Sequence, residues 1–131
     1  GAEFAKRRKE LPIVHKNKRI HVGDCATTCS GDLQSSWCVH AVGPDYRSVN
    51  HYIGDLQLIS VYKNVLREAC AVGARSIAFP LISAGIYRGN RYLPAIIKIA
   101  IETILKNWYN GLEYVFFIGY SEEEQQILQN M

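Results

Sequence analysis

The 131-residue sequence lacks the features that mark membrane and secreted proteins. It has no run of about 18 consecutive apolar residues, so we expect no membrane-spanning helix and no membrane partner. Residues 1–10 are basic, but no apolar stretch follows them, which is not the pattern of a secretory signal. We therefore expect an intracellular protein, either cytoplasmic or nuclear.

The cysteines lack the paired CxxC spacing of a structural zinc site. Cys25 and Cys29 are separated by three residues, whereas Cys38 and Cys70 fall within apolar segments. A reduced thiol in such a segment packs as a small hydrophobic group. We expect buried free thiols, no metal site and a reducing compartment.

The composition is that of an ordinary globular domain, with 48% hydrophobic and 21% charged residues. No internal repeat and no linker divides the chain, so we expect one domain over residues 1–131. The net charge of +3 is uneven, because residues 1–20 hold seven Lys or Arg and two Glu. This basic segment could contact a nucleic-acid backbone, or it could be a solvated helix face followed by a loop.

The apolar patterns predict alternating strands and helices. Residues 55–73 repeat apolar side chains with helical spacing, with Asp55 near the N-terminal end and Gly73 at the stop. Residues 76–82 and 114–119 are nearly continuous apolar runs, typical of strands buried on both faces. The other expected elements are a helix over 2–10, a strand region over 19–28 interrupted at Gly23, a turn over 31–36, a strand over 37–42, a helix over 92–109 and a last helix capped by Ser121.

This order of elements predicts an α/β fold with a largely parallel sheet. In such sheets, ligands bind at the carboxyl ends of the strands. Only about four strands can be counted from these patterns, so at least one sheet edge is expected to be unfinished.

The loop at Ser83–Gly89 follows one of these strand ends and is the strongest candidate for a binding site. Gly85 lets the backbone approach a ligand and permits dihedral angles that are closed to other residues. Successive backbone N–H groups in such a turn form a concave anion nest, and Arg88 could add a positive charge. The loop has no Walker lysine, and its alternative interpretation is a simple connector.

Two tyrosines follow strand ends in the same way. Tyr87 lies within the loop, and Tyr120 follows the strand over 114–119. An aromatic ring beside a phosphate nest suits a nucleotide, because it can pack on a ribose or a base. Each tyrosine taken alone could instead be a half-buried cover for its strand end.

The sequence gives little sign of the usual catalytic combinations of side chains. The four histidines form no metal-ligand pattern, and no Ser-His-Asp set can be argued. His40 lies in an apolar strand, where a hydrogen-bonded core histidine is the simpler interpretation. The catalytic residues are therefore unknown, no cofactor is expected, and the sequence indicates a binding site more clearly than a reaction.

The chain contains, in order, the segments GDCATTCSGDLQSSWCVHAVGPDYRS, IAFPLISAGIYRG and YVFFIGYSEEE. These segments resemble the macrodomain family of ADP-ribose-binding modules, with a likeness that runs from about residue 3 to 129. The resemblance implies a three-layer α/β/α fold with a mixed, largely parallel sheet and an ADP-ribose cleft at the strand ends.

The resemblance also implies roles for individual residues. The loop of Ser83, Ala84, Gly85, Ile86 and Tyr87 would wrap the diphosphate through its backbone amides, with Tyr87 beside the proximal ribose. Pro80 and Leu81 would line the adenine side, and Tyr120 would pack on adenine or its ribose. Arg88 replaces the usual small residue, and it would either pair with a phosphate or narrow the cleft.

The sequence departs from the family pattern in its N-terminal region. The family begins with two strands, an adenine-selecting acidic residue, an Asn-Ala-Ala-Asn segment and a glycine-rich loop, none of which is present here. We therefore expect an N-terminally incomplete domain, or a subunit whose open sheet edge is covered by a protein partner.

Three functions follow from this interpretation. The first is binding of ADP-ribose or an ADP-ribosylated protein, with mono-ADP-ribosyl hydrolysis when the domain is complete. The second is a degenerate macrodomain that acts as a structural or interaction module in a larger assembly. The third is binding of RNA or poly(ADP-ribose) through the basic N-terminal segment.

Overall fold

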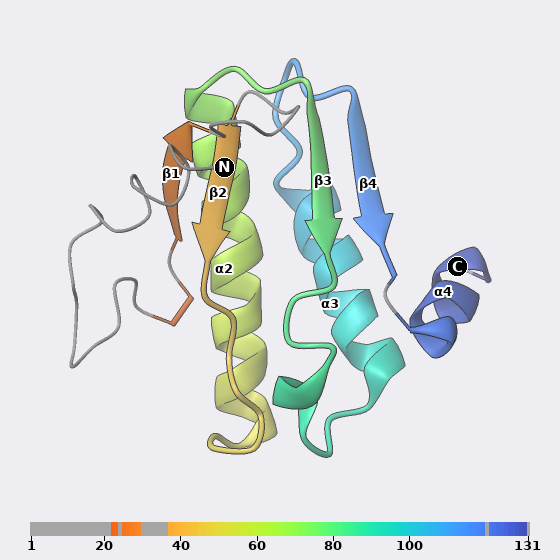
Figure 1. The fold of residues 1–131 in the computed structure, drawn as a ribbon. Helices are drawn as coiled ribbons and strands as arrows, with labels where there is room; N and C mark the ends of the chain where they lie inside the picture. Colours follow the sequence, from red (N-terminus) through yellow and green to blue (C-terminus); the bar gives the residue numbers. More distant parts are fainter. Residues whose placement is uncertain (1–21, 24, 30–36, 120, 131) are drawn as a thin grey trace.

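The computed structural model describes residues 22–23, 25–29, 37–119 and 121–130. Along the chain these residues form β1 (Cys25–Cys29), β2 (Trp37–Ala41), α2 (His51–Ala71), β3 (Ser76–Pro80), the 3₁₀ turn η1 (Ile86–Arg88), α3 (Leu93–Lys106), β4 (Tyr114–Ile118) and α4 (Glu122–Gln129) (Figure 1). The predicted helix over 2–10, the predicted turn over 31–36 and Tyr120 lie outside the described residues.

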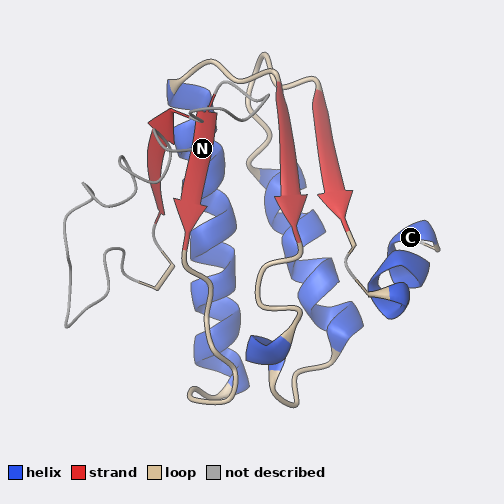
Figure 2. Cartoon of the chain, viewed as in Figure 1, coloured by secondary structure: helices blue, strands red, loops and turns tan. Residues whose placement is uncertain are grey.

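The strands confirm the predicted α/β fold with a mixed sheet. β1 and β2 pair antiparallel, whereas β3 and β4 pair parallel, with Ser76 opposite Tyr114 and Pro80 opposite Ile118. Figure 2 shows β2 and β3 on the inner sides of these two pairs, with β1 and β4 outside them. No hydrogen-bonded ladder joins β2 to β3 among the strands that the structure describes, so two strand edges face each other across an opening.

The core lies on one face of the strands, where α2 and α3 pack side by side (Figure 1). Burial of apolar surface at about 25 cal/mol per Å² is the main driving force for this packing. The residues with the least exposure are Leu58, Val61, Tyr62 and Leu66 of α2, Ile96, Ile97 and Ala100 of α3, and Phe79 of β3.

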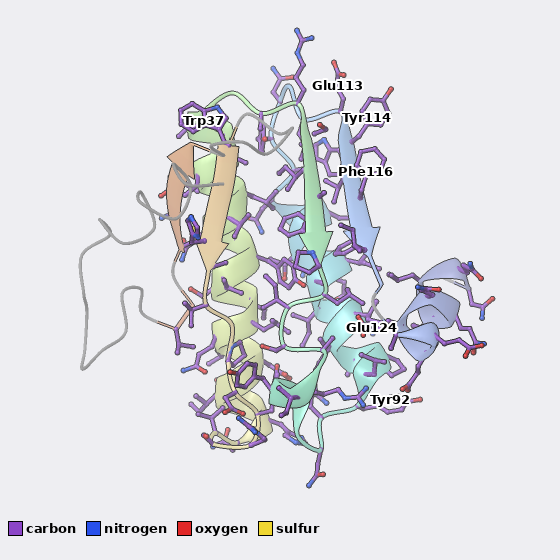
Figure 3. All side chains as sticks on the ribbon, viewed as in Figure 1. Trp37, Tyr92, Glu113, Tyr114, Phe116 and Glu124 are labelled. Carbon is purple, nitrogen blue, oxygen red and sulfur yellow. The ribbon has the colours of Figure 1, made fainter. Side chains whose placement is uncertain are left out.

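The opposite face of β3 and β4 is open in the described part of the chain. Tyr114 and Phe116 are 60% and 56% exposed, and their rings stack on each other at 6.1 Å between centroids (Figure 3). Alternation along β4 explains this exposure, because Val115 and Phe117 point to the packed face and their neighbours point away.

Three of the expected local features are wrong. β3 and β4 are not buried on both faces, because alternate side chains such as Tyr114 and Phe116 lie on the open face in the described part of the chain. Helix α2 begins at His51 rather than near Asp55, because the Asn50 side chain caps it by accepting a hydrogen bond from the Ile53 N–H at 2.8 Å. Cys70 is an exposed free thiol and not a buried one, because it lies on the outer face of the last turn of α2. The Ser121 cap is confirmed, since its hydroxyl accepts from the Glu124 N–H at 3.0 Å.

Candidate functional site

Two loops meet at the carboxyl ends of β2 and β3. The first joins β2 to α2 over residues 42–50, and the second, which we call the ligand loop, comprises residues 81–92 between β3 and α3. The Tyr46 N–H donates to the Tyr87 carbonyl at 2.7 Å, and the Ser83 hydroxyl donates to the Pro44 carbonyl at 2.6 Å. These long-range bonds fix the two loops against each other.

The base of the ligand loop is tied to the helical layer. The Ile82 N–H donates to the Tyr62 hydroxyl at 3.0 Å, and Tyr62 is fully buried in α2. Burial raises the pKa of this tyrosine, so its hydroxyl stays protonated and neutral. Ile82, near the start of the ligand loop, is thus held by a partly buried polar contact.

Beyond this base the backbone turns with exposed amides. The Ala84 N–H donates to Leu81, and the Arg88 N–H donates to Gly85 at 3.0 Å. No described residue accepts a hydrogen bond from the N–H groups of Gly85, Ile86 and Tyr87. Three successive turn amides without a described acceptor are available as hydrogen-bond donors to an anion.

Gly85 supplies space rather than an unusual φ angle. Its φ is −86°, and the left-handed values in the loop belong to Ser83 at 61° and Gly89 at 58°. A Cβ built on Gly85 would meet no atom within 4 Å. The protein's own packing therefore does not require a glycine at this position, whereas close approach of a ligand would.

The side chains of the predicted ligand residues fall into two groups. Leu81 and Ala84 are buried, and they pack with Leu93 and Ile97 of α3. Ile86 and Tyr87 are 73% and 53% exposed and are available to a ligand. Pro80, at the end of β3, is exposed as well.

One neighbour of the ligand loop was missed in the sequence. The Arg47 guanidinium lies over the ring of Tyr87, 5.1 Å from its centroid, and forms an ion pair with Asp45 at 2.9 Å. A cation over an aromatic face contributes about 0.5–1 kcal/mol at an exposed site. One face of Tyr87 is thus occupied, and nothing in the local spacing of Arg47 could have indicated this contact.

Asp55 was also missed, because its position suggested only a helix end. Its carboxylate accepts from the Tyr46 hydroxyl at 2.8 Å and from two nitrogens of Arg91 at 3.0 and 2.7 Å. Partial burial would raise the pKa of Asp55, but the hydrogen bonds from Arg91 and Tyr46 outweigh burial and lower it. Burial and the bond to Asp55 together raise the pKa of Tyr46.

Two hollows lie near these elements. One, of about 590 Å³, is lined by both loops through residues that include Tyr46, Arg47, His51 and Gly89, and by none of the predicted ligand residues. The other, of about 400 Å³, is the opening between β2 and β3, which we call the strand slot. Among the described residues no cluster of His, Cys, Asp and Glu could hold a metal ion, and no helix could cross a membrane.

Comparison with known sequences gives the same family that the motifs indicate. The macro domain family profile matches residues 1–95. The chain is 38% identical over 111 residues to the macro domain-containing protein SCO6450 of Streptomyces coelicolor, which covers 83% of this chain and 63% of that protein. It is 36% identical over 119 residues to a Klebsiella pneumoniae protein named O-acetyl-ADP-ribose deacetylase, covering 91% and 67% of the two chains.

Among solved structures, a macrodomain of Oceanobacillus iheyensis with ADP superposes with a TM-score of 0.84 and 26% identity. The match covers 99% of this chain and 68% of that one. The chain thus spans about two thirds of the length of the proteins that it matches.

Proposed function

The chain belongs to the macro domain family, and on this premise we propose that it binds ADP-ribose, either free or attached to a protein. The observation that supports the proposal most directly is the open space over Gly85 beside three amides without a described acceptor. A diphosphate placed there would receive hydrogen bonds from neutral backbone donors in a concave turn.

The remaining roles are those that the family resemblance implies. Tyr87 keeps one ring face free of Arg47, and this face would pack on the proximal ribose. The backbone at Pro80 and Leu81 would border the adenine, and Tyr120 would pack on adenine or its ribose. Arg88, which forms no ion pair with a described residue, would add a charge to the phosphate site.

The test is a titration of ADP-ribose into the wild-type chain and a Gly85→Glu variant. Because a Cβ at position 85 would meet no atom within 4 Å apart from its chain neighbours, we expect the variant to fold normally. Its carboxylate would fill the diphosphate position and repel the ligand, so binding should be lost. Asn110→Glu is the matched control, since it adds the same charge on an exposed turn at the other end of the strands. Equal affinity of wild type and Gly85→Glu would reject this site.

For hydrolytic activity we propose a more limited role. The Klebsiella relative is named as a deacetylase of O-acetyl-ADP-ribose. In hydrolytic members of the family, as the resemblance implies, an asparagine segment contacts the distal ribose, and this sequence does not contain it. We therefore propose ligand binding by residues 1–131, and hydrolysis of mono-ADP-ribosyl groups only when that segment is supplied.

A second function, as an interaction module, is favoured by the strand slot. Its walls are the facing edges of β2 and β3, which no ladder joins among the described strands, and its floor is Val65, Ala69 and Val72. None of the described residues that line it carries a charged side chain. Two facing rows of backbone donors and acceptors suit an extended, uncharged segment of another polypeptide, which would join the sheet as a strand. Such a segment is the protein partner that we propose.

This proposal can be tested with peptides from the third of the Klebsiella relative that the chain does not match. Insertion of one of them should slow hydrogen exchange at the backbone amides of both β2 and β3. Protection of neither strand by any of the peptides would reject a strand-binding slot.

A further inference from the structure

Asp55 occupies a junction between the two loops of the candidate site. It lies on α2, yet the two side chains bonded to it come from different loops, Tyr46 from the first and Arg91 from the ligand loop. Arg91 is 36 residues away in the chain and approaches with two of its guanidinium nitrogens, Nε and Nη2. A paired, two-pronged contact of this kind fixes orientation as well as distance.

Tyr46 connects Asp55 directly to the ligand loop. Its ring packs against α2 at Gly54, where an added Cβ would clash with the ring. Its backbone N–H holds the Tyr87 carbonyl at 2.7 Å, within the turn that presents the three open amides. Tyr46 thus links Asp55, through its hydroxyl, to the Tyr87 carbonyl, through its backbone N–H, so a shift of the Tyr46 backbone would move Tyr87.

Arg91 holds the other end of the same turn. Its N–H donates to the Arg88 carbonyl at 3.0 Å, so the side chain that reaches Asp55 sits directly after the turn. The side chains of Arg91 and Asp55 are only 20% and 26% exposed. The pair is thus partly shielded from water, unlike the exposed Lys98–Glu102 pair at 3.8 Å on α3.

We propose that Asp55 is a positioning residue for the ligand loop, which it holds in its binding conformation by anchoring Tyr46 and Arg91 together. Asp55 itself does not contact the ligand. This inference rests on the proposed binding of ADP-ribose, and it adds the residue that sets the conformation of the site.

The experiment compares wild type with Asp55→Asn, which keeps the shape of the side chain and removes its charge. We expect ADP-ribose affinity to fall about tenfold, because a charge-assisted pair is replaced by weaker neutral hydrogen bonds. Tyr46→Phe, which removes only the hydroxyl, should cause a smaller loss in the same direction. Glu102→Gln is the matched control, since it removes a carboxylate from an ion pair far from the loops and should leave affinity unchanged.

Hydrogen exchange of the ligand-free protein separates positioning from general stability. In Asp55→Asn the hydrogen-bonded amides of Tyr46, Arg88 and Arg91 should exchange faster, while those buried in α3 should not. Since Tyr46→Phe leaves the ion pair intact, it also serves as the test if Asp55→Asn fails to fold.

The outcomes distinguish this inference from the proposed function. If wild type does not bind ADP-ribose, the proposed function fails, and the exchange data still decide whether Asp55 holds the loop. If wild type binds, but affinity and loop exchange are unchanged in both variants, then the positioning role of Asp55 is refuted.

Discussion

The ligand loop and the strand slot are neighbouring parts of one molecule, but they differ in how far the described chain completes them. At the loop, every major contact has its partner within the chain: Tyr62 holds the base, Pro44 and Tyr46 hold the flank, and Asp55 holds the end. At the slot, two strand edges face each other without a ladder between them.

This difference teaches that a binding loop and its supporting sheet can be specified separately. The loop is fixed by α2 and by the β2–α2 connection, both of which pack into the main core through Tyr46 and Tyr62. It does not rely on hydrogen bonds across the slot, since none joins β2 to β3. We therefore expect changes around Tyr46 to affect the site strongly. Changes in the slot away from Pro80 and Ile82, which line the slot and also belong to the site, should affect it weakly.

The largest effect on stability is expected from Gly54→Ala, which disturbs the packing of Tyr46, a residue that holds the ligand loop. The added methyl group would collide with the ring of Tyr46, and overpacking of this kind costs about 1–3 kcal/mol of stability. Denaturant unfolding followed by circular dichroism would measure the loss. Gly85→Ala is the comparison, since its methyl group enters open space and its effect on unfolding should be within about 0.5 kcal/mol. Equal stabilities of the two variants would contradict the packing described for Tyr46.

Tyr62→Phe should have the next largest effect. It leaves the Ile82 N–H without its acceptor in a buried setting, at a cost of about 1–3 kcal/mol. Because Ile82 starts the ligand loop, the Ile82 amide should also lose protection from hydrogen exchange. Tyr109→Phe, whose hydroxyl donates to Ala74 at the opposite end of the strands, should leave exchange in the ligand loop unchanged.

A smaller effect should appear in the pH dependence of stability. The folded protein holds the pKa of Asp55 below the value of about 3.9 that is usual for an unfolded chain. The stability that Asp55 supplies is therefore complete above about pH 4 and is lost as the pH falls through the folded pKa. Unfolding midpoints at pH 6 and pH 3 should differ less for Asp55→Asn than for wild type. The same pH response in both proteins would show that the Asp55 pKa is not lowered by folding.

The smallest effect is expected from Ala78→Lys in the strand slot. Ala78 is exposed on β3, so a lysine can extend into water, and the change in stability should lie within about 0.5 kcal/mol. Affinity for ADP-ribose should also be unchanged. A large loss of affinity would mean that ligand binding at the loop depends on the strand slot, and it would show that the two regions are not independent.

Local signals in the sequence predicted much of the fold. Apolar runs located the strands, helical spacing located α2 and α3, and Ser121 marked the start of α4 correctly. The start of α2 was placed too late because Asp55 was taken as the residue at the N-terminal end of the helix, although Asn50 is a good cap. The exposed position of Cys70 was missed because an apolar neighbourhood in sequence does not say which face of a helix a residue occupies.

The candidate site was only partly predictable. The ligand loop was recognisable from its own residues, because small residues, a glycine and an exposed tyrosine are all adjacent in the chain. Asp55 and Arg47 were not, because their contacts with Arg91 and Tyr87 join positions 36 and 40 residues apart. Such pairs depend on how the elements pack, which no local pattern states. The roles of the loop residues toward a ligand stay predictions.

The most direct test of the account is a calorimetric titration of the 131-residue chain with ADP-ribose, with circular dichroism confirming that the chain is folded. The account predicts saturable binding at one site, because the loop is held by contacts within the chain and does not depend on the strand slot. A folded chain that gives no saturable heat at two temperatures would contradict it, and the proposed binding of ADP-ribose by this chain would fail.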